Sequence, residues 1–239
     1  MAAREATDTG YIVHRKRLRE TSLLLQVFTR LHGCFGVIAR GALSSKKGGG
    51  SAYAEFTPYF LVWSGKSDLP TLVRAEPTER GLRLEAERLF SAMYLNELIV
   101  RLVHRGEGDD AGYRAYELTL KSLAGEAPIE PALRHFEALL LDACGYGMEL
   151  AQAVDTGTAL DVDASYFYIP ERGPVSRIPP VPHRVVSGGA LLALAGALPW
   201  GSTRLREAKS LMRFLIHHHL GGQALSSREL FRLSGDASQ

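Results

Sequence analysis

The sequence has few of the residues that mark disulfide-rich, metal-rich or membrane-spanning proteins. Its 239 residues include only two cysteines, Cys34 and Cys144, too few for a disulfide framework or a four-cysteine zinc site. No run approaches 18 consecutive apolar residues, and the longest apolar patch, 190–198, is interrupted by glycine, which excludes a membrane-spanning helix. The amino-terminal residues lack the apolar core of a secretory signal. We therefore expect a reduced, cytoplasmic setting with no membrane contact.

The sequence also lacks the short motifs of common catalytic and metal sites. It has no Walker-type phosphate loop, no His-Glu-x-x-His and no Cys-x-x-Cys. Ser44 to Lys47 formally matches Ser-x-x-Lys, but the match lies in a glycine-rich loop and not at the start of an apolar helix. Three consecutive histidines, 217–219, lack the i, i+4 spacing of metal ligands on one helix face and suit the negative end of a helix dipole. We expect no enzyme activity, no metal and no cofactor.

Charge is almost balanced over the whole chain but is unevenly distributed. The formal net charge is +2. Residues 1–75 hold eleven Lys and Arg against five Asp and Glu, a net charge of +6, whereas residues 76–199 hold eleven against eighteen, a net charge of −7. Residues 200–239 hold six against three, a net charge of +3. This asymmetry favours a polyanionic partner for the amino-terminal part, although two domains of different composition would give the same pattern.

The first 75 residues show the pattern of a small β-barrel. Short segments rich in β-branched and aromatic residues alternate with turn-like breaks, which predicts five strands at 11–17, 21–29, 34–40, 54–63 and 69–75. Five strands in so short a segment are typical of an OB-type barrel, which closes its own edges. Pro58, inside the fourth strand, predicts an edge or a bulge there. Most aromatic side chains of this segment are expected in the core.

The rest of the chain has mainly helical periodicity. Apolar residues recur at steps of three and four, which predicts helices over 82–105, 111–124, 130–144, 187–198 and 204–220. Gly145 is expected to end the third helix, and Ser202 or Thr203 to cap the last one. Residues 155–182 are rich in Pro, Gly and Asp and predict a loop-rich excursion with about two short strands.

These patterns together predict an α+β fold. A five-stranded OB-fold barrel occupies residues 1–78 as a nucleic-acid-binding domain. A helical domain follows at residues 79–239 and contains the loop-rich insertion at 155–182.

Basic residues of the barrel segment are candidate phosphate contacts. The loop 41–51 carries Lys46 and Lys47 among glycines, and its composition suits either a phosphate clamp or a solvated connector. Arg40 precedes this loop, and Arg15, Arg17 and Arg19 follow the first predicted strand or lie at its end. Strand alternation sends Arg15 and Arg17 to one face and the intervening lysine to the other, so the whole cluster cannot face one ligand.

A second basic stripe lies on the last predicted helix. Arg206, Lys209 and Arg213 are spaced by three and four residues and share one side. They form either a solvated face or a second polyanion contact. The chain contains a single Asn, Asn96, and four Gln. Because these residue types are the usual readers of adenine, their scarcity favours binding led by phosphates over base readout.

Short runs spread through the chain carry a resemblance to a known family. They are Glu20-Thr21-Ser22-Leu23-Leu24-Leu25, Val27-Phe28-Thr29, Ala39-Arg40-Gly41-Ala42, Phe56-Thr57-Pro58, Tyr94 with Asn96-Glu97-Leu98, Pro131-Ala132-Leu133-Arg134 with Phe136-Glu137, Gly145-Tyr146-Gly147 and Leu225-Ser226-Ser227-Arg228-Glu229-Leu230-Phe231. Their order and spacing over about 210 residues resemble the RecO family of bacterial recombination mediators.

This resemblance implies an N-terminal OB-fold, a helical C-terminal domain and a role in DNA repair. It implies binding of single- and double-stranded DNA, annealing of complementary strands, binding of the C-terminal tail of single-stranded DNA-binding protein (SSB), and action with RecR to load RecA. It also implies a cytoplasmic, nucleoid-associated protein. Some family members carry a four-cysteine zinc site in the excursion, but residues 155–182 contain no cysteine here, so no metal is expected.

The resemblance also places the receptor for the SSB tail. The tail is acidic and ends in apolar residues with a free carboxylate, so its receptor needs an apolar groove and a cation. By resemblance Arg134 takes the cation's role, with Leu133 and Leu139 beside it. The alternative is an ordinary exposed arginine in an i, i+3 pair with Glu137.

Three other functions stay open from the sequence alone. They are an OB-fold module that binds structured RNA, an adaptor whose barrel binds protein, and a hydrolase without a known motif. Competition between DNA and RNA, a DNA-free pull-down and a turnover assay distinguish them.

Overall fold

A computed structural model describes residues 5–44 and 53–227. The described chain divides into two compact units. Unit 1 holds the residues up to Gly125 together with 225–227, and unit 2 holds Glu126–Ala224. The domain boundary predicted between residues 78 and 79 rests on composition, a different criterion, and stays a prediction.

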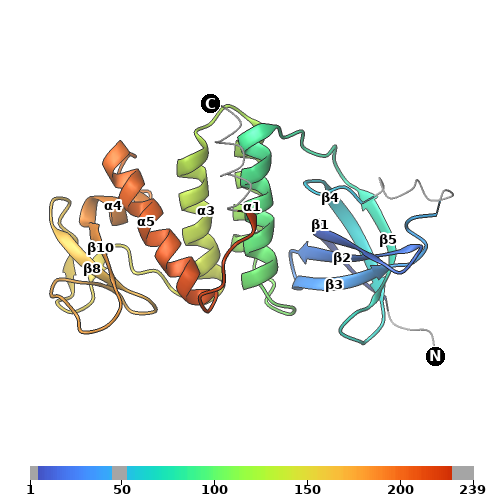
Figure 1. Ribbon diagram of the computed structural model, residues 1–239, viewed down its shortest axis with the longest axis horizontal. Helices are drawn as coiled ribbons and strands as arrows, with labels where there is room; N and C mark the ends of the chain where they lie inside the picture. Colours follow the sequence, from blue (N-terminus) through green and yellow to red (C-terminus); the bar gives the residue numbers. More distant parts are fainter. Residues whose placement is uncertain (1–4, 45–52, 228–239) are drawn as a thin grey trace. The chain divides into compact units, whose positions relative to one another are not determined.

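Unit 1 begins with the closed five-stranded barrel that the sequence predicts (Figure 1). Its strands are β1 (Glu5–Leu18), β2 (Ser22–Thr29), β3 (Gly33–Ala39), β4 (Pro58–Ser64) and β5 (Thr71–Pro77), joined in the order β1-β2-β3-β5-β4. The long β1 pairs with β4 through its first half and with β2 through its second half. A parallel pairing of Ile38 with Thr71 joins β3 to β5. The α+β fold with an OB-type barrel is therefore confirmed.

Pro58 does not mark an edge or a bulge, as the sequence predicted. It is the first residue of β4 and lies opposite Tyr11 of β1, and the first position of a strand is one that proline tolerates. The irregularity in β4 falls at Val62/Trp63 instead. A closed barrel leaves β4 paired on both sides, so the edge expectation was wrong.

Alternate side chains of the strands fill the barrel. The core consists of Ile12, Leu23, Leu25, Val27, Phe35, Val37, Ala39, Ala42, Tyr59, Leu61, Trp63 and Leu72. Most aromatic side chains of the barrel segment are buried, as predicted. Tyr53 and Phe60 are the half-buried exceptions among the described residues, and the Phe60 ring already faces the Arg74 guanidinium at 5.6 Å.

Two helices complete unit 1. They are α1 (Ala86–Leu102) and α2 (Asp110–Ala124), so the first helix starts four residues later than predicted. Tyr11 and Phe28 of the barrel pack edge-on against Tyr116 of α2, with ring centroids 5.1 and 5.6 Å apart. The Tyr11 hydroxyl also donates to Glu117 at 3.0 Å. This aromatic contact binds α2 to the barrel and makes one compact unit of barrel and helices.

Unit 2 contains three helices and several short strands. The helices are α3 (Ile129–Ala143), α4 (Gly188–Leu194) and α5 (Ser202–His219). Between α3 and α4 lie β6 (Gln152–Ala153), β7 (Thr158–Ala159), β8 (Ser165–Ile169), β9 (Gly173–Val175) and β10 (Arg184–Ser187). The strands β10-β8-β9 form a small sheet, and β10 packs against α4 and α5 (Figure 1).

The predicted helix ends in unit 2 are partly right. Gly145 follows α3 in the left-handed region, with φ of 79°, as expected of a terminating glycine. The predicted cap of α5 is wrong, because Gly201 occupies that position and no side chain caps the helix. The excursion contains three strands, β7 to β9, where about two were expected. In the described part of the chain, no helix is both long and apolar enough to cross a membrane.

Candidate nucleic-acid interface

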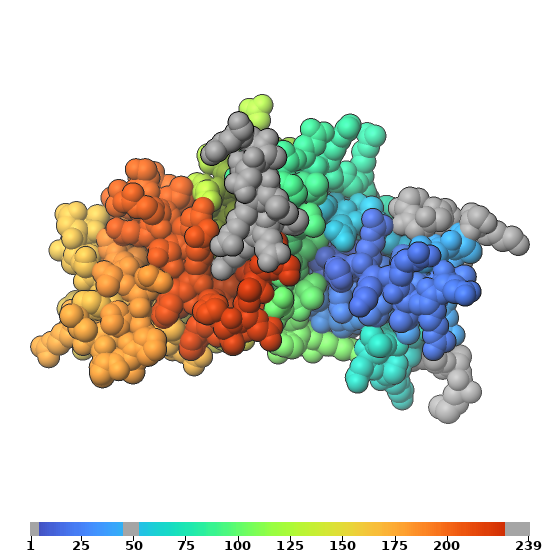
Figure 2. Space-filling model, viewed as in Figure 1, coloured from blue at the N-terminus to red at the C-terminus, as the bar shows by residue number. Residues whose placement is uncertain are grey.

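The strand register gathers the predicted barrel arginines at one end of the barrel. Arg15 lies opposite Leu25, and Arg17 lies opposite Leu23, which in turn pairs with Ala39 just before Arg40. Arg19 lies in the turn between β1 and β2 and adopts a positive φ of 60°. All four arginines are exposed. Residues of β1, dark blue in Figure 2, lie at the surface in that view.

The same register places Arg15 and Arg17 on one face of the sheet and Lys16 on the other. Directly opposed residues of an antiparallel pair share one face, so Arg15 and Arg17 lie on the face of the barrel-core residues Leu25 and Leu23. Lys16 lies opposite Leu24 on the other face. The backbone bulge between Ile12 and His14 bends β1 just before this basic segment. We call Arg15, Arg17, Arg19 and Arg40 the basic barrel end.

The remaining predicted phosphate contacts form two groups, the loop lysines and the stripe on α5. Lys46 and Lys47 lie outside the described residues. The stripe on α5 does not consist of three available cations, because Lys209 is ion-paired with Glu130 of α3 at 2.5 Å. Arg206 and Arg213 are exposed.

The predicted tail-binding residues of α3 do not share one open surface. Arg134 is 4% exposed and pairs at 2.7 Å with Glu137, which is 1% exposed. The i, i+3 pair is therefore present, but the expectation that it is exposed is wrong. Leu133 is also buried, whereas Leu139 is 51% exposed. Leu139 is thus exposed, whereas the other two are buried.

Leu139 lines an apolar hollow of unit 2 that the sequence analysis missed. The hollow has a volume of about 340 Å³ and is lined by His135, Ala138, Leu139, Asp142, Met148, Leu150, Leu194, Ala195 and Gly196. Its walls come from α3, from the segment after α3 and from the end of α4. The sequence analysis named only Leu139 of this lining, by resemblance, because the walls after α3 and at the end of α4 come from other parts of the sequence.

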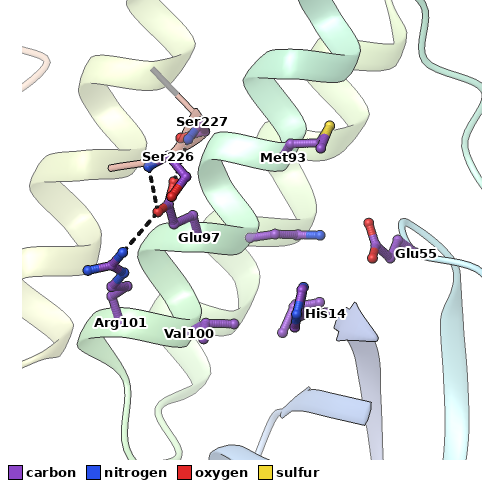
Figure 3. A pocket seen from close by; sticks show the side chains of 10 residues that line it. His14, Glu55, Met93, Glu97, Val100, Arg101, Ser226 and Ser227 are labelled. Atoms are coloured by element: carbon purple, nitrogen blue, oxygen red, sulfur yellow. Dashed lines mark hydrogen bonds and ion pairs between the residues drawn. The ribbon is translucent and has the colours of Figure 1, made fainter. Parts of the chain in front are cut away.

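A larger pocket of about 540 Å³ lies within unit 1, between the barrel and α1 (Figure 3). His14 and Glu55 face α1 from the barrel side, and Met93 and Val100 supply apolar surface from α1. Burial raises the pKa of Glu55, and the nearby Arg15 and His14 only partly offset this rise. The sequence analysis did not identify this pocket.

Polar groups of α1 organise the far side of the pocket. Asn96 is 4% exposed and accepts a hydrogen bond from the Tyr116 hydroxyl at 2.6 Å. Glu97 accepts from the backbone N–H groups of Ser226 and Ser227 at 2.9 and 2.8 Å and pairs with Arg101 at 3.3 Å. Burial alone raises the pKa of Glu97, but the bonds from Ser227 and Ser226 and the charge of Arg101 outweigh it and lower the pKa.

This contact joins two of the runs that carry the family resemblance. Asn96-Glu97 and Ser226-Ser227 are about 130 residues apart in the sequence and meet through the Glu97 carboxylate. The sequence alone does not show that these two runs are in contact. The pattern of bonds indicates that Glu97 positions the segment 225–227 on α1.

Comparisons with known proteins cover almost the whole chain. Residues 1–80 match the family model "Recombination protein O N terminal", and residues 83–229 match "Recombination protein O C terminal". The chain is 41% identical to DNA repair protein RecO of Methylococcus capsulatus, over 97% of this chain and 95% of the relative. It is 37% identical to that of Azoarcus sp., over 97% and 98%, and 36% identical to that of Haemophilus influenzae, over 93% and 94%.

Proposed function

Because the chain belongs to the RecO family of DNA repair proteins, we propose that it is a non-enzymatic recombination mediator that holds DNA by its phosphates. The observation that carries this proposal is the basic barrel end, where four exposed arginines gather on a closed barrel. The barrel's aromatic rings are mostly buried, so few can stack on bases. Phosphate contacts then supply most of the affinity, for single and double strands alike.

Annealing follows from the same contacts. Two complementary strands repel each other through their phosphates, and arginines that neutralise one backbone lower the cost of bringing the second strand close. Sequence-independent contacts leave the base edges available for pairing. No proton transfer or bond cleavage is required, in keeping with a mediator that does not catalyse a reaction.

The partners follow from the family. We propose that the SSB C-terminal tail binds unit 2 beside Leu139, with its apolar end in the hollow that Leu139 lines. Leu133 and Arg134, also predicted for this site, are buried, so a direct contact with the tail would require Arg134 to leave its pair with Glu137. The exposed Leu139 supports the apolar part of this site.

We also propose action with RecR to load RecA, in the cytoplasm and in association with the nucleoid. The exposed Arg206 and Arg213 of α5, with Lys209 between them, are proposed as a weaker second DNA contact.

The first test measures how DNA affinity depends on salt. Each phosphate contact to a single strand contributes a slope of about −0.7 in log affinity against log salt concentration. The double variant Arg17→Ala/Arg40→Ala should therefore weaken binding to unrelated oligonucleotides and reduce the slope by about 1.4. Fluorescence anisotropy of a labelled oligonucleotide, titrated at several salt concentrations, gives both quantities.

The control is Lys66→Ala. Lys66 is exposed and follows Ser64, which pairs with Glu5 at the opposite end of β1 from Arg17, so this variant should keep the slope of the unaltered protein. An unchanged slope in the double variant removes the basic barrel end from the interface.

Lys46→Ala/Lys47→Ala, measured alongside, tests the glycine-rich loop. Stronger competition by RNA than by DNA would favour an RNA-binding module instead.

A further inference from the structure

Three potential metal ligands meet in unit 2, in a place that neither the DNA contacts nor the tail site uses. Glu171 lies in the turn between β8 and β9, and His218 and His219 lie in the last turn of α5. One ligand atom from each residue lies within 4.8 Å of the other two. The closest pair, His218 Nε2 and Glu171 Oε1, is 3.5 Å apart.

Local structure presents these side chains to one another. Glu171 has a positive φ of 61°, a strained backbone conformation for a residue other than glycine. The β8–β9 turn is closed by Ile169 opposite Gly173 and by a hydrogen bond from Arg172 N–H to the Ile169 carbonyl. On α5, the His219 ring stacks on Tyr146 at 3.9 Å with an interplanar angle of 24°, which restricts its orientation.

The distances fit a small tetrahedral cation. Zn²⁺ binds imidazole nitrogen and carboxylate oxygen at about 2.0–2.2 Å, so its tetrahedral ligand atoms lie roughly 3.3 Å apart. The 3.5 Å between His218 Nε2 and Glu171 Oε1 is already close to that value. The ligand atoms of the other two pairs lie within 4.8 Å of each other, so they need to approach by about 1.5 Å at most. Rotation of these side chains supplies such a movement, because His218 and Glu171 are 47% and 66% exposed.

We propose that Glu171, His218 and His219 form a Zn²⁺ site with water as the fourth ligand. Two imidazoles and one carboxylate suit zinc, whereas Mg²⁺ and Ca²⁺ prefer oxygen ligands throughout. A bound ion ties the β8–β9 turn to the end of α5.

The site differs from what the sequence analysis considered. Adjacent histidines lack the i, i+4 spacing of two ligands on one helix face, and residues 155–182 contain no cysteine, so no metal was expected there. The third ligand comes from a turn 47 residues before His218. Only the fold brings that turn to the end of α5.

The experiment titrates the full-length, tag-free chain with Zn²⁺ by calorimetry and with Co²⁺ by absorption spectroscopy. We expect one ion per chain and an intense visible Co²⁺ spectrum of tetrahedral type. Glu171→Gln and His219→Ala should each weaken Zn²⁺ binding by about tenfold or more. Saturating Zn²⁺ should raise the thermal unfolding midpoint of the unaltered chain but not that of His218→Ala/His219→Ala.

His217→Ala is the matched control, because His217 belongs to the same histidine run but not to the cluster. It should leave the Zn²⁺ affinity within about twofold of the unaltered value. Other histidine–carboxylate pairs, His32 with Asp8 and His104 with Glu107, provide background binding that Glu171→Gln does not change. Equal loss in His217→Ala, no effect of Glu171→Gln, or no binding at all would each overturn the proposal.

Discussion

At the scale of single residues, the burial of Arg134 changes how the tail-binding proposal has to be tested. Arg134→Ala removes the guanidinium that pairs with a carboxylate only 1% exposed. Removing one partner of a buried ion pair typically costs about 3–5 kcal/mol. We expect the free energy of unfolding, measured in urea, to fall by this order. Lost tail binding in this variant then reports unfolding as much as recognition.

Leu139→Ala is the companion variant that avoids this ambiguity. Leu139 is half exposed, so its truncation should change stability by no more than about 0.5 kcal/mol while weakening the binding of an SSB-tail peptide. An Arg134→Ala protein as stable as the unaltered chain would contradict the buried pair. The spacing of Arg134 and Glu137 offered their pairing as the alternative to a tail-binding role, but it could not predict their burial, which depends on what packs over α3.

At the scale of elements, Glu97 holds the segment 225–227 on α1, and we expect the stability that this contact contributes to depend on pH. The pKa of Glu97 is lower in the folded chain than its ordinary value of 4.5. A lowered pKa stabilises the fold above the unfolded value, and this stabilisation is lost as pH falls through the folded value. Glu97→Gln should therefore be less stable than the unaltered chain at pH 7, and the difference should shrink progressively below pH 4.5.

Urea unfolding of both proteins between pH 7 and pH 3.5 measures this difference. Glu87→Gln serves as the control, because Glu87 is an exposed glutamate of the same helix and should show a smaller dependence. A difference between Glu97→Gln and the unaltered chain that stays constant with pH would contradict this prediction, because ionisation of Glu97 would then not contribute to the stability. The contact would then not depend on the charge of the Glu97 carboxylate.

Sequence patterns predicted the long helices and strands better than the short strands and the contacts between elements. Segments rich in β-branched and aromatic residues between turn-like breaks identified the five barrel strands. Steps of three and four identified the main helices, because these helices are long enough to show a period. The strands β6 and β7 have two residues each, too few for any period, so the excursion was predicted only as loop-rich. The pocket of unit 1 was missed because its walls come from Val13, Glu55, α1 and Ser226, segments far apart in the sequence.

At the scale of the whole molecule, the proposal assigns two ligands to two compact units. The basic barrel end belongs to unit 1, and the hollow beside Leu139 belongs to unit 2. Arg17→Ala/Arg40→Ala should weaken DNA binding and leave the affinity for an SSB-tail peptide unchanged. Leu139→Glu should do the reverse, because it places a negative charge in the hollow that we propose as the site for the apolar end of an acidic tail.

The combination of these variants also tests whether the two sites communicate. Coupling between two ligands is reciprocal, so any factor by which the tail peptide changes DNA affinity must equal the factor by which DNA changes peptide affinity. Independent sites predict a factor of one in both directions, and no change in either salt slope when the other ligand is present. A factor well away from one that disappears in Leu139→Glu would mean that tail binding controls DNA release. With coupled sites, a mediator that transfers a strand from SSB to another protein would release DNA in response to tail binding. With independent sites, the tail would act only by concentrating the protein on SSB-covered DNA.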